Sequence, residues 1–232
     1  MRQIIKEGFS LKGKEFLLSL IVFSYLVISF SVLSFYTSSD YLPYIQLFFL
    51  LLENYITVSV YYGIRQLLWE GILDIPAIFT KGRQLFFRVL GYKIMAGAFI
   101  ILVFAFCLSM VELVKNSSII TAGFITAFTI LWLTFPVYLF LLTLLAPLVI
   151  IADDVPLFKA VRMSMGFIRG HLLDTGKLIL LLLPLWAFVI YLLKLYNEKV
   201  TFLQMVIFYL FSLLEIITVK VFLLFYRKRE ER

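Results

Sequence analysis

The residues best suited to do chemistry in this sequence are four polar side chains inside long apolar stretches. Glu53 and Asn54 interrupt one stretch, and Glu215 and Lys220 interrupt another. An ionisable group near the centre of a bilayer costs about 2.5–3.5 kcal/mol even on lenient insertion scales, so it marks a candidate functional site. Glu53 lies near the middle of its stretch, is expected to face other helices, and could carry a proton or a cation. The alternative is a protonated Glu53 with only a structural hydrogen bond to a Tyr or Ser of a neighbouring helix.

Glu215 and Lys220 are five positions apart. That spacing rotates them by about 140° on an ideal helix and makes them poor partners for each other. Lys220 lies seven residues before Arg227, so its long side chain can reach the cytoplasmic interface, which favours a structural role. Glu215 can instead pair with another stretch, including the one that holds Glu53 and Asn54.

The other reactive side chains form no recognisable catalytic, metal-binding or nucleotide-binding set. His171 is the only histidine and Cys107 the only cysteine, so their spacing assembles neither a metal site nor a catalytic dyad. Ser164 lacks the partners of known nucleophile motifs, and the sequence has no phosphate-binding glycine loop. Asp153 and Asp154 could hold a cation, but capping the next helix is the simpler interpretation. We therefore expect no catalytic residue, no metal and no cofactor.

Composition decides what surrounds these side chains. Of the 232 residues, 63% are hydrophobic and 15% are charged, whereas soluble domains have about 45–50% apolar and about 25% charged residues. Too few polar side chains remain to cover a water-soluble globule. The chain is expected to be an all-α integral membrane protein whose solvent is the lipid bilayer.

Six apolar stretches are long enough to cross the hydrocarbon core, which takes about 20 helical residues. The fourth stretch is overlong and contains Pro136 and Pro147, which predicts a kink or an unwound turn, and the fifth contains Pro184. The first stretch is too long for a signal peptide and lacks its small-residue exit. The six stretches cover approximately residues 16–36, 44–64, 92–114, 119–151, 178–196 and 202–226.

The distribution of basic residues predicts the orientation. The amino-terminal segment, the two long connections and the tail carry 17 Lys and Arg residues, against three in the alternate connections. Positive charge collects on the cytoplasmic side, so both termini are expected there. The net charge of +7 then reflects topology and anionic lipid headgroups, and a nucleic-acid partner is not expected. The connections 37–43, 115–118 and 197–201 are short, which predicts a single domain over 1–232, a six-helix bundle of three transmembrane hairpins.

Two cytoplasmic segments, about 74–90 and 154–171, are expected to form short amphipathic helices at the membrane surface. Their basic residues are candidate contacts for lipid headgroups or for a cytoplasmic partner. A basic residue followed by glycine recurs before three spans, which favours an internal repeat over chance similarity. The repeated dipeptides are Lys12-Gly13, Lys81-Gly82 and Arg169-Gly170, and the candidate contacts are Lys81, Arg83, Arg88, Lys159, Arg162 and Arg169.

The stretch 146–170 reads APLVIIADDVPLFKAVRMSMGFIRG. It resembles the signature of a broad group of bacterial polytopic proteins, which includes the membrane domain attached to some glycerophosphodiester phosphodiesterases and related stand-alone membrane proteins of unknown function. The resemblance implies a multi-pass protein of the bacterial cytoplasmic membrane. No phosphodiesterase domain is expected in this chain, so the resemblance implies no catalytic residue.

Three functions fit these observations. The first is a transport-related or permease-like component, because a buried carboxylate, a repeat and a proline-interrupted span also occur in substrate pathways. The second is a scaffold or accessory subunit that docks another membrane subunit or a cytoplasmic protein through its basic helices. An intramembrane enzyme has the least support, because it needs convergent polar groups and the sequence offers isolated ones.

Overall fold

The computed structural model describes residues 1–37, 39–195 and 202–230, and the regular elements in this part of the chain are all helices. The all-α prediction is therefore confirmed, and the predicted connection 197–201 lies outside the described residues. The helices are α1 (Arg2–Phe9), α2 (Gly13–Phe35), α3 (Leu42–Trp69), α4 (Ile75–Lys115), α5 (Ile119–Thr143), α6 (Ala146–Asp153), α7 (Leu157–Gly170), α8 (Leu172–Leu195) and α9 (Phe202–Glu230).

Six helical stretches of the described chain are long and apolar enough to cross a membrane. Each overlaps one of the six apolar stretches that the sequence predicts, and together they indicate a multi-pass membrane protein. They are Gly13–Phe35, Leu42–Trp69, Ile75–Lys115, Ile119–Asp153, Leu172–Lys194 and Gln204–Lys228.

Helix α4 differs from the expectation of a short surface helix followed by a separate span. It runs without a break for 41 residues, a length of about 60 Å. Asp74 caps its first turn by accepting a hydrogen bond from the Ala77 backbone N–H at 3.2 Å, and Pro76 occupies the first turn. Nothing in the sequence ends the helix at the expected boundary, because a single Gly91 in a helix costs only about 1 kcal/mol.

The fourth apolar stretch is interrupted, as its prolines predict. Helix α5 ends at Thr143 and α6 begins at Ala146. Pro147 lies in the first turn of α6, where its missing N–H costs no hydrogen bond. The Ser164 hydroxyl of α7 donates to the Leu142 carbonyl at 2.9 Å and so satisfies one backbone group at the interruption. Pro136, by contrast, lies inside α5 without ending it.

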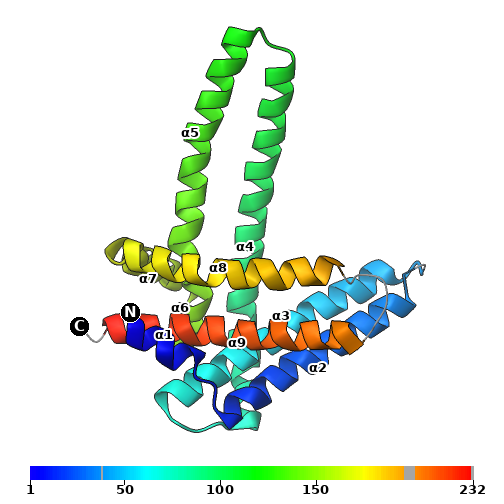
Figure 1. Ribbon diagram of the computed structural model, residues 1–232, viewed down its shortest axis with the longest axis vertical. Coiled ribbons are helices and arrows are strands. Elements are labelled where there is room, and N and C mark those ends of the chain that lie inside the picture. Colours follow the sequence, from blue (N-terminus) through cyan, green and yellow to red (C-terminus); the bar gives the residue numbers. More distant parts are fainter. Residues whose placement is uncertain (38, 196–201, 231–232) are drawn as a thin grey trace.

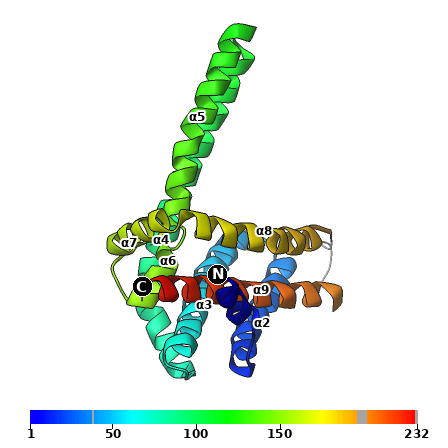
Figure 2. The same cartoon turned by 60° about the vertical axis from the view of Figure 1, so that its left-hand side comes forward.

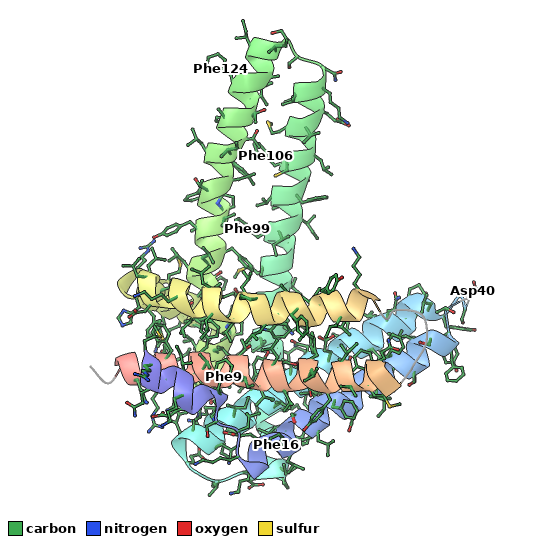
Figure 3. All side chains as sticks on the ribbon, viewed as in Figure 1. Phe9, Phe16, Asp40, Phe99, Phe106 and Phe124 are labelled. Carbon is green, nitrogen blue, oxygen red and sulfur yellow. The ribbon has the colours of Figure 1, made fainter. Side chains whose placement is uncertain are left out.

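The helices form a packed body with a projecting arm, which we define as residues 94–135 of α4 and α5. Both views show α4 and α5 side by side, standing across the direction of α8 and α9 (Figures 1 and 2). No residue of the arm is buried, and Phe106 of α4 stacks on Trp132 of α5 with ring centroids 3.9 Å apart. Phe106 and Phe124 lie well away from the body (Figure 3). This crossed arrangement departs from a bundle of helices with one common axis.

The hydrophobic core lies in the body, where α2, α3, α6 and the second half of α9 meet. Leu18, Ile64, Ile150 and Phe225 are fully buried there. Helix α1 packs along α9, so the start of the chain lies close to the end of α9 (Figure 1).

The three basic-glycine dipeptides do not share a structural role. Gly82 faces α3 so closely that a Cβ atom would overlap the Ser59 side chain, so only glycine fits there. A Cβ atom at Gly13 or Gly170 would meet no atom within 4 Å. The internal repeat stays a prediction from sequence, because close helix packing explains only one of its three glycines.

Candidate functional site

The structure brings Glu53 and Glu215 into one electrostatic neighbourhood. The Tyr61 hydroxyl of α3 donates a hydrogen bond to Glu215 Oε1 of α9 at 3.0 Å. Glu53 of α3 and Lys93 of α4 both act electrostatically on the Glu215 carboxyl. We call these four residues, Glu53, Tyr61, Lys93 and Glu215, the mid-helix polar cluster.

The two carboxyl groups of the cluster lie at corresponding depths in their helices. Glu53 is the twelfth of 28 residues in α3, and Glu215 is the twelfth residue of the apolar stretch Gln204–Lys228. The two helices pack against each other and begin at the same end of the body (Figure 1). The pairing of Glu215 with the helix that holds Glu53, which the sequence left open, is therefore observed through Tyr61.

Glu53 does not face the other helices, as the sequence led us to expect. It is exposed on the surface of α3, whereas the next residue, Asn54, is only 2% exposed. Successive residues of a helix are rotated by about 100°, so one of two neighbours turns outward when the other turns inward. The cluster therefore includes one carboxyl group exposed at the surface, Glu53, and one that is partly buried, Glu215.

Asn54 is a polar group inside the packed body. Neither its Oδ1 nor its Nδ2 has a hydrogen-bond partner among the described residues. A buried amide without partners costs about 1–3 kcal/mol per unsatisfied group. The buried Asn54 therefore lowers the stability of the folded protein. Apolar packing alone does not explain why an asparagine occupies this position beside the polar cluster.

Lys220 belongs to a different site, in which its partner is Glu15. The Lys220 ammonium lies 2.7 Å from Glu15 Oε1, and both residues are 4% exposed. Lys220 also donates to the Ser10 carbonyl, and Glu15 Oε2 accepts from the Lys12 backbone N–H at 2.6 Å. Sequence reasoning missed Glu15, whose only local signal is an acidic residue in the first turn of α2.

The Asp153-Asp154 pair does not cap α7, so that interpretation is wrong. Helix α7 has no side-chain cap; instead the Asp153 carboxylate accepts from the Tyr226 hydroxyl of α9 at 2.6 Å. Asp154 has a left-handed backbone (φ 51°) and binds Lys81 and Arg88 of α4 at 2.6 and 2.7 Å. The hydrogen bond from the Lys81 ammonium, aided by Arg88, holds the pKa of Asp154 below its usual value of 3.8. The turn before α7 thus ties α4 and α9 together.

The six predicted interfacial basic residues consequently fall into two groups. Lys81 and Arg88 form ion pairs with Asp154. The other four, Arg83, Lys159, Arg162 and Arg169, are exposed on α4 and α7.

His171 is a packing residue rather than a member of the polar cluster. Its ring lies 4.9 Å from the Phe167 ring and 6.2 Å from the Phe225 ring, measured between centroids. Cys107 is partly buried within the arm.

A pocket opens where α1, the start of α2, the end of α3 and α9 meet. We call it the amino-terminal pocket; its volume is about 820 Å³. Phe9 and Phe16 flank the segment that joins α1 to α2 beside it (Figure 3). Gly71, in the turn after α3, forms part of the wall and has φ 72°, a backbone conformation that favours glycine.

Comparison of the chain with protein-family models, with curated proteins and with solved structures found no match. The resemblance of residues 146–170 to bacterial polytopic proteins therefore stays a prediction.

Proposed function

We propose that this chain is a transport-related, permease-like membrane protein whose mid-helix polar cluster takes up a proton or a cation. The observation that carries the proposal is the Glu215 carboxyl, which lies partly buried within the apolar stretch of α9 and accepts a hydrogen bond from Tyr61 of α3. Carboxyl groups at that depth are costly, and in membrane proteins they commonly line ion and proton pathways. Tyr61 supplies a hydrogen-bond donor to the Glu215 carboxyl.

The interruption between α5 and α6 supports the same function. It leaves α5 and α6 as separate helices within one apolar stretch, Ile119–Asp153. Discontinuous spans of this kind occur in secondary transporters, where the broken ends can move as separate units. The Ser164 hydrogen bond to the end of α5 would hold this interruption in place.

The proposed orientation places both termini in the cytoplasm, with the spans paired as three hairpins in a bacterial cytoplasmic membrane. The closeness of α1 to the end of α9 supports it, because an even number of crossings returns the chain to its starting side (Figure 1). A cysteine-free background, Cys107→Ala, allows a direct test with a membrane-impermeant maleimide on intact cells. Ser117→Cys should be labelled, and Gly166→Cys should be labelled only after lysis. The reverse pattern contradicts the orientation.

Ion flux into liposomes tests the transport proposal. Purified protein is reconstituted in vesicles with a pH-sensitive dye in the lumen, and a potassium diffusion potential is imposed; a parallel set carries a sodium gradient. Wild-type vesicles should take up protons or sodium faster than protein-free vesicles. Glu215→Gln should remove this flux and Tyr61→Phe should reduce it, because each alters the hydrogen bond between α3 and α9.

Glu112→Gln is the matched control, since Glu112 is an exposed carboxylate at the far end of α4. It should leave the flux unchanged. Wild-type flux equal to that of protein-free vesicles for both ions would contradict the proposal, and so would equal losses in Glu112→Gln and Glu215→Gln.

A second candidate is an accessory subunit or scaffold, and the arm is the observation that favours it. None of residues 94–135 is buried, so the arm offers an apolar surface on which transmembrane helices of another subunit can pack. The exposed Lys159, Arg162 and Arg169 of α7 would provide the contact to a cytoplasmic protein. Purification of the native complex in mild detergent should then yield a stoichiometric partner, and recovery of the chain alone would speak against this function.

A further inference from the structure

The amino-terminal pocket does not involve the polar cluster. Its volume of about 820 Å³ lies within the range of small-molecule sites, about 300–1,000 Å³. Four elements build it: α1, the start of α2, the end of α3 and α9. Lysine side chains gather at its walls, and they are Lys6, Lys12, Lys14 and Lys220.

The acidic residues of the wall are already neutralised. Glu15 is paired with Lys220. Glu7 is paired with Lys228 of α9 at 2.7 Å, which holds the pKa of Glu7 below its usual value of 4.5. The wall therefore has an uncompensated positive charge.

Three lysines supply that charge, and they are Lys6, Lys12 and Lys14. All three are exposed, and none forms an ion pair with another described residue. Lys14 and Gly13 are also the first residues of α2, where backbone N–H groups lack intrahelical acceptors and the helix dipole favours a negative charge. The pocket thus combines three free ammonium groups with a helix amino terminus, a combination that suits a phosphate group.

Part of the pocket wall is apolar. Leu67 and Leu68 of α3 and Leu224 of α9 line it. A ligand that binds both the lysines and the leucines of the pocket needs a phosphate group and a hydrocarbon part. The pocket lies at the ends of α2, α3 and α9, which is the level of lipid headgroups if these helices cross the bilayer.

We propose that the amino-terminal pocket binds the phosphate of an anionic phospholipid headgroup, with Lys6, Lys12 and Lys14 as the cationic contacts. The proposal does not depend on ion transport by the polar cluster. A free phosphate would offer the same chemistry to the lysines but would leave the leucine wall without a partner.

Binding of a headgroup-labelled fluorescent phosphatidylglycerol to the full-length protein tests the proposal. The protein is held in nanodiscs of phosphatidylcholine, and competition is measured with unlabelled phosphatidylglycerol, phosphatidylcholine and inorganic phosphate. Unlabelled phosphatidylglycerol should displace the probe. Displacement by phosphatidylcholine to the same extent would show that the site ignores charge, and displacement by inorganic phosphate alone at millimolar concentration would assign the site to a free anion. Either result overturns the proposal.

Two variants locate the binding site. The triple variant Lys6→Gln, Lys12→Gln, Lys14→Gln should weaken the probe's affinity about tenfold or more, since each basic residue adds to the attraction for an anionic headgroup. The matched control removes three exposed basic residues of α7, Lys159→Gln, Arg162→Gln and Arg169→Gln, and should retain the affinity. Equal losses in the two triple variants would show general surface attraction and would overturn the site.

Gly13→Trp changes the pocket without changing its charge. A Cβ atom at Gly13 meets no atom within 4 Å, so the ring enters open space and the helix can still form. The affinity for the probe should fall, whereas Gly166→Trp, at an equally open position of α7, should leave it unchanged. Unchanged affinity in Gly13→Trp, with the thermal unfolding temperature of the wild type, would place the lipid elsewhere.

Discussion

Replacing Lys220 by methionine tests whether the amino-terminal segment is held to α9 by a buried ion pair. Lys220 and Glu15 have side chains only 5% and 6% exposed, and their charged atoms lie 2.7 Å apart. The substitution keeps the length of the side chain but leaves the Glu15 carboxylate buried, with the Lys12 backbone N–H as its remaining hydrogen-bond donor. It also removes the donor to the Ser10 carbonyl.

The expected cost follows from the charge that is left behind. Removing one partner of a buried pair costs about 3–5 kcal/mol of unfolding free energy, because the other charge stays desolvated. Replacing both partners by apolar residues is far less costly, since no charge then remains in the interior. We therefore expect Lys220→Met and Glu15→Met each to lose several kcal/mol and the double variant to lose much less than their sum.

Equilibrium unfolding in mixed detergent micelles, followed by far-ultraviolet circular dichroism, measures these differences. The control is Lys177→Met, because Lys177 forms an ion pair with Asp174 at 3.9 Å while its side chain is 68% exposed. Such surface pairs contribute about 0–1 kcal/mol. The reasoning is refuted if Lys220→Met costs no more than Lys177→Met, or if the losses of the two single variants simply add in the double variant.

Thermal unfolding in detergent tests three further contacts. Gly82→Ala should destabilise the protein by about 1–3 kcal/mol, because its Cβ overlaps Ser59, and an unchanged unfolding temperature would contradict the close approach of α3 and α4. Ser164→Ala should cost about 1–3 kcal/mol by leaving a buried carbonyl at the end of α5 without its donor, whereas Ser164→Thr should retain part of the stability. Asp154→Asn should reduce the free energy of unfolding above pH 3.8, the unfolded pKa of Asp154, because Lys81 lowers the pKa of this carboxyl in the folded protein. The difference in stability between wild type and variant should shrink as the pH falls from about 5 through the folded pKa. A difference that does not depend on pH would contradict the ion pair.

The sequence predicts the positions of the apolar helices well because that property is local. Hydropathy and length are read along the chain, and the six stretches expected from them overlap the six helices that can span a membrane. The prolines likewise predict the interruption before Ala146. A proline lacks the backbone N–H that would donate to the preceding turn, so its effect on the helix is local. The continuity of α4 was missed because its basic first half looks like a separate surface helix, although nothing between Ile75 and Lys115 ends the helix.

The partners of the polar residues could not be predicted, because they depend on tertiary packing. Lys220 and Glu15 are 205 positions apart, and Glu215 of the same helix as Lys220 binds Tyr61 of α3. The outward direction of Glu53 depends on which face of α3 the other helices cover. In the same way, the position of Asp154 in the sequence suits a helix cap, but α4 lies close enough for Asp154 to form ion pairs with Lys81 and Arg88 instead.

The length of α4 relates the arm to the polar cluster. From residue 94 to Lys115 the helix has 22 residues, a length of about 33 Å. Lys93 therefore stands where the apolar half of α4 begins, and there it acts electrostatically on Glu215 of α9. Because no residue of the arm is buried, a tilt of α4 at the arm would change the distance from Lys93 to Glu215 and hence the electrostatic interaction between them. If the chain transports ions as proposed, such a tilt would couple movement of the arm to the binding of a proton or cation at the cluster.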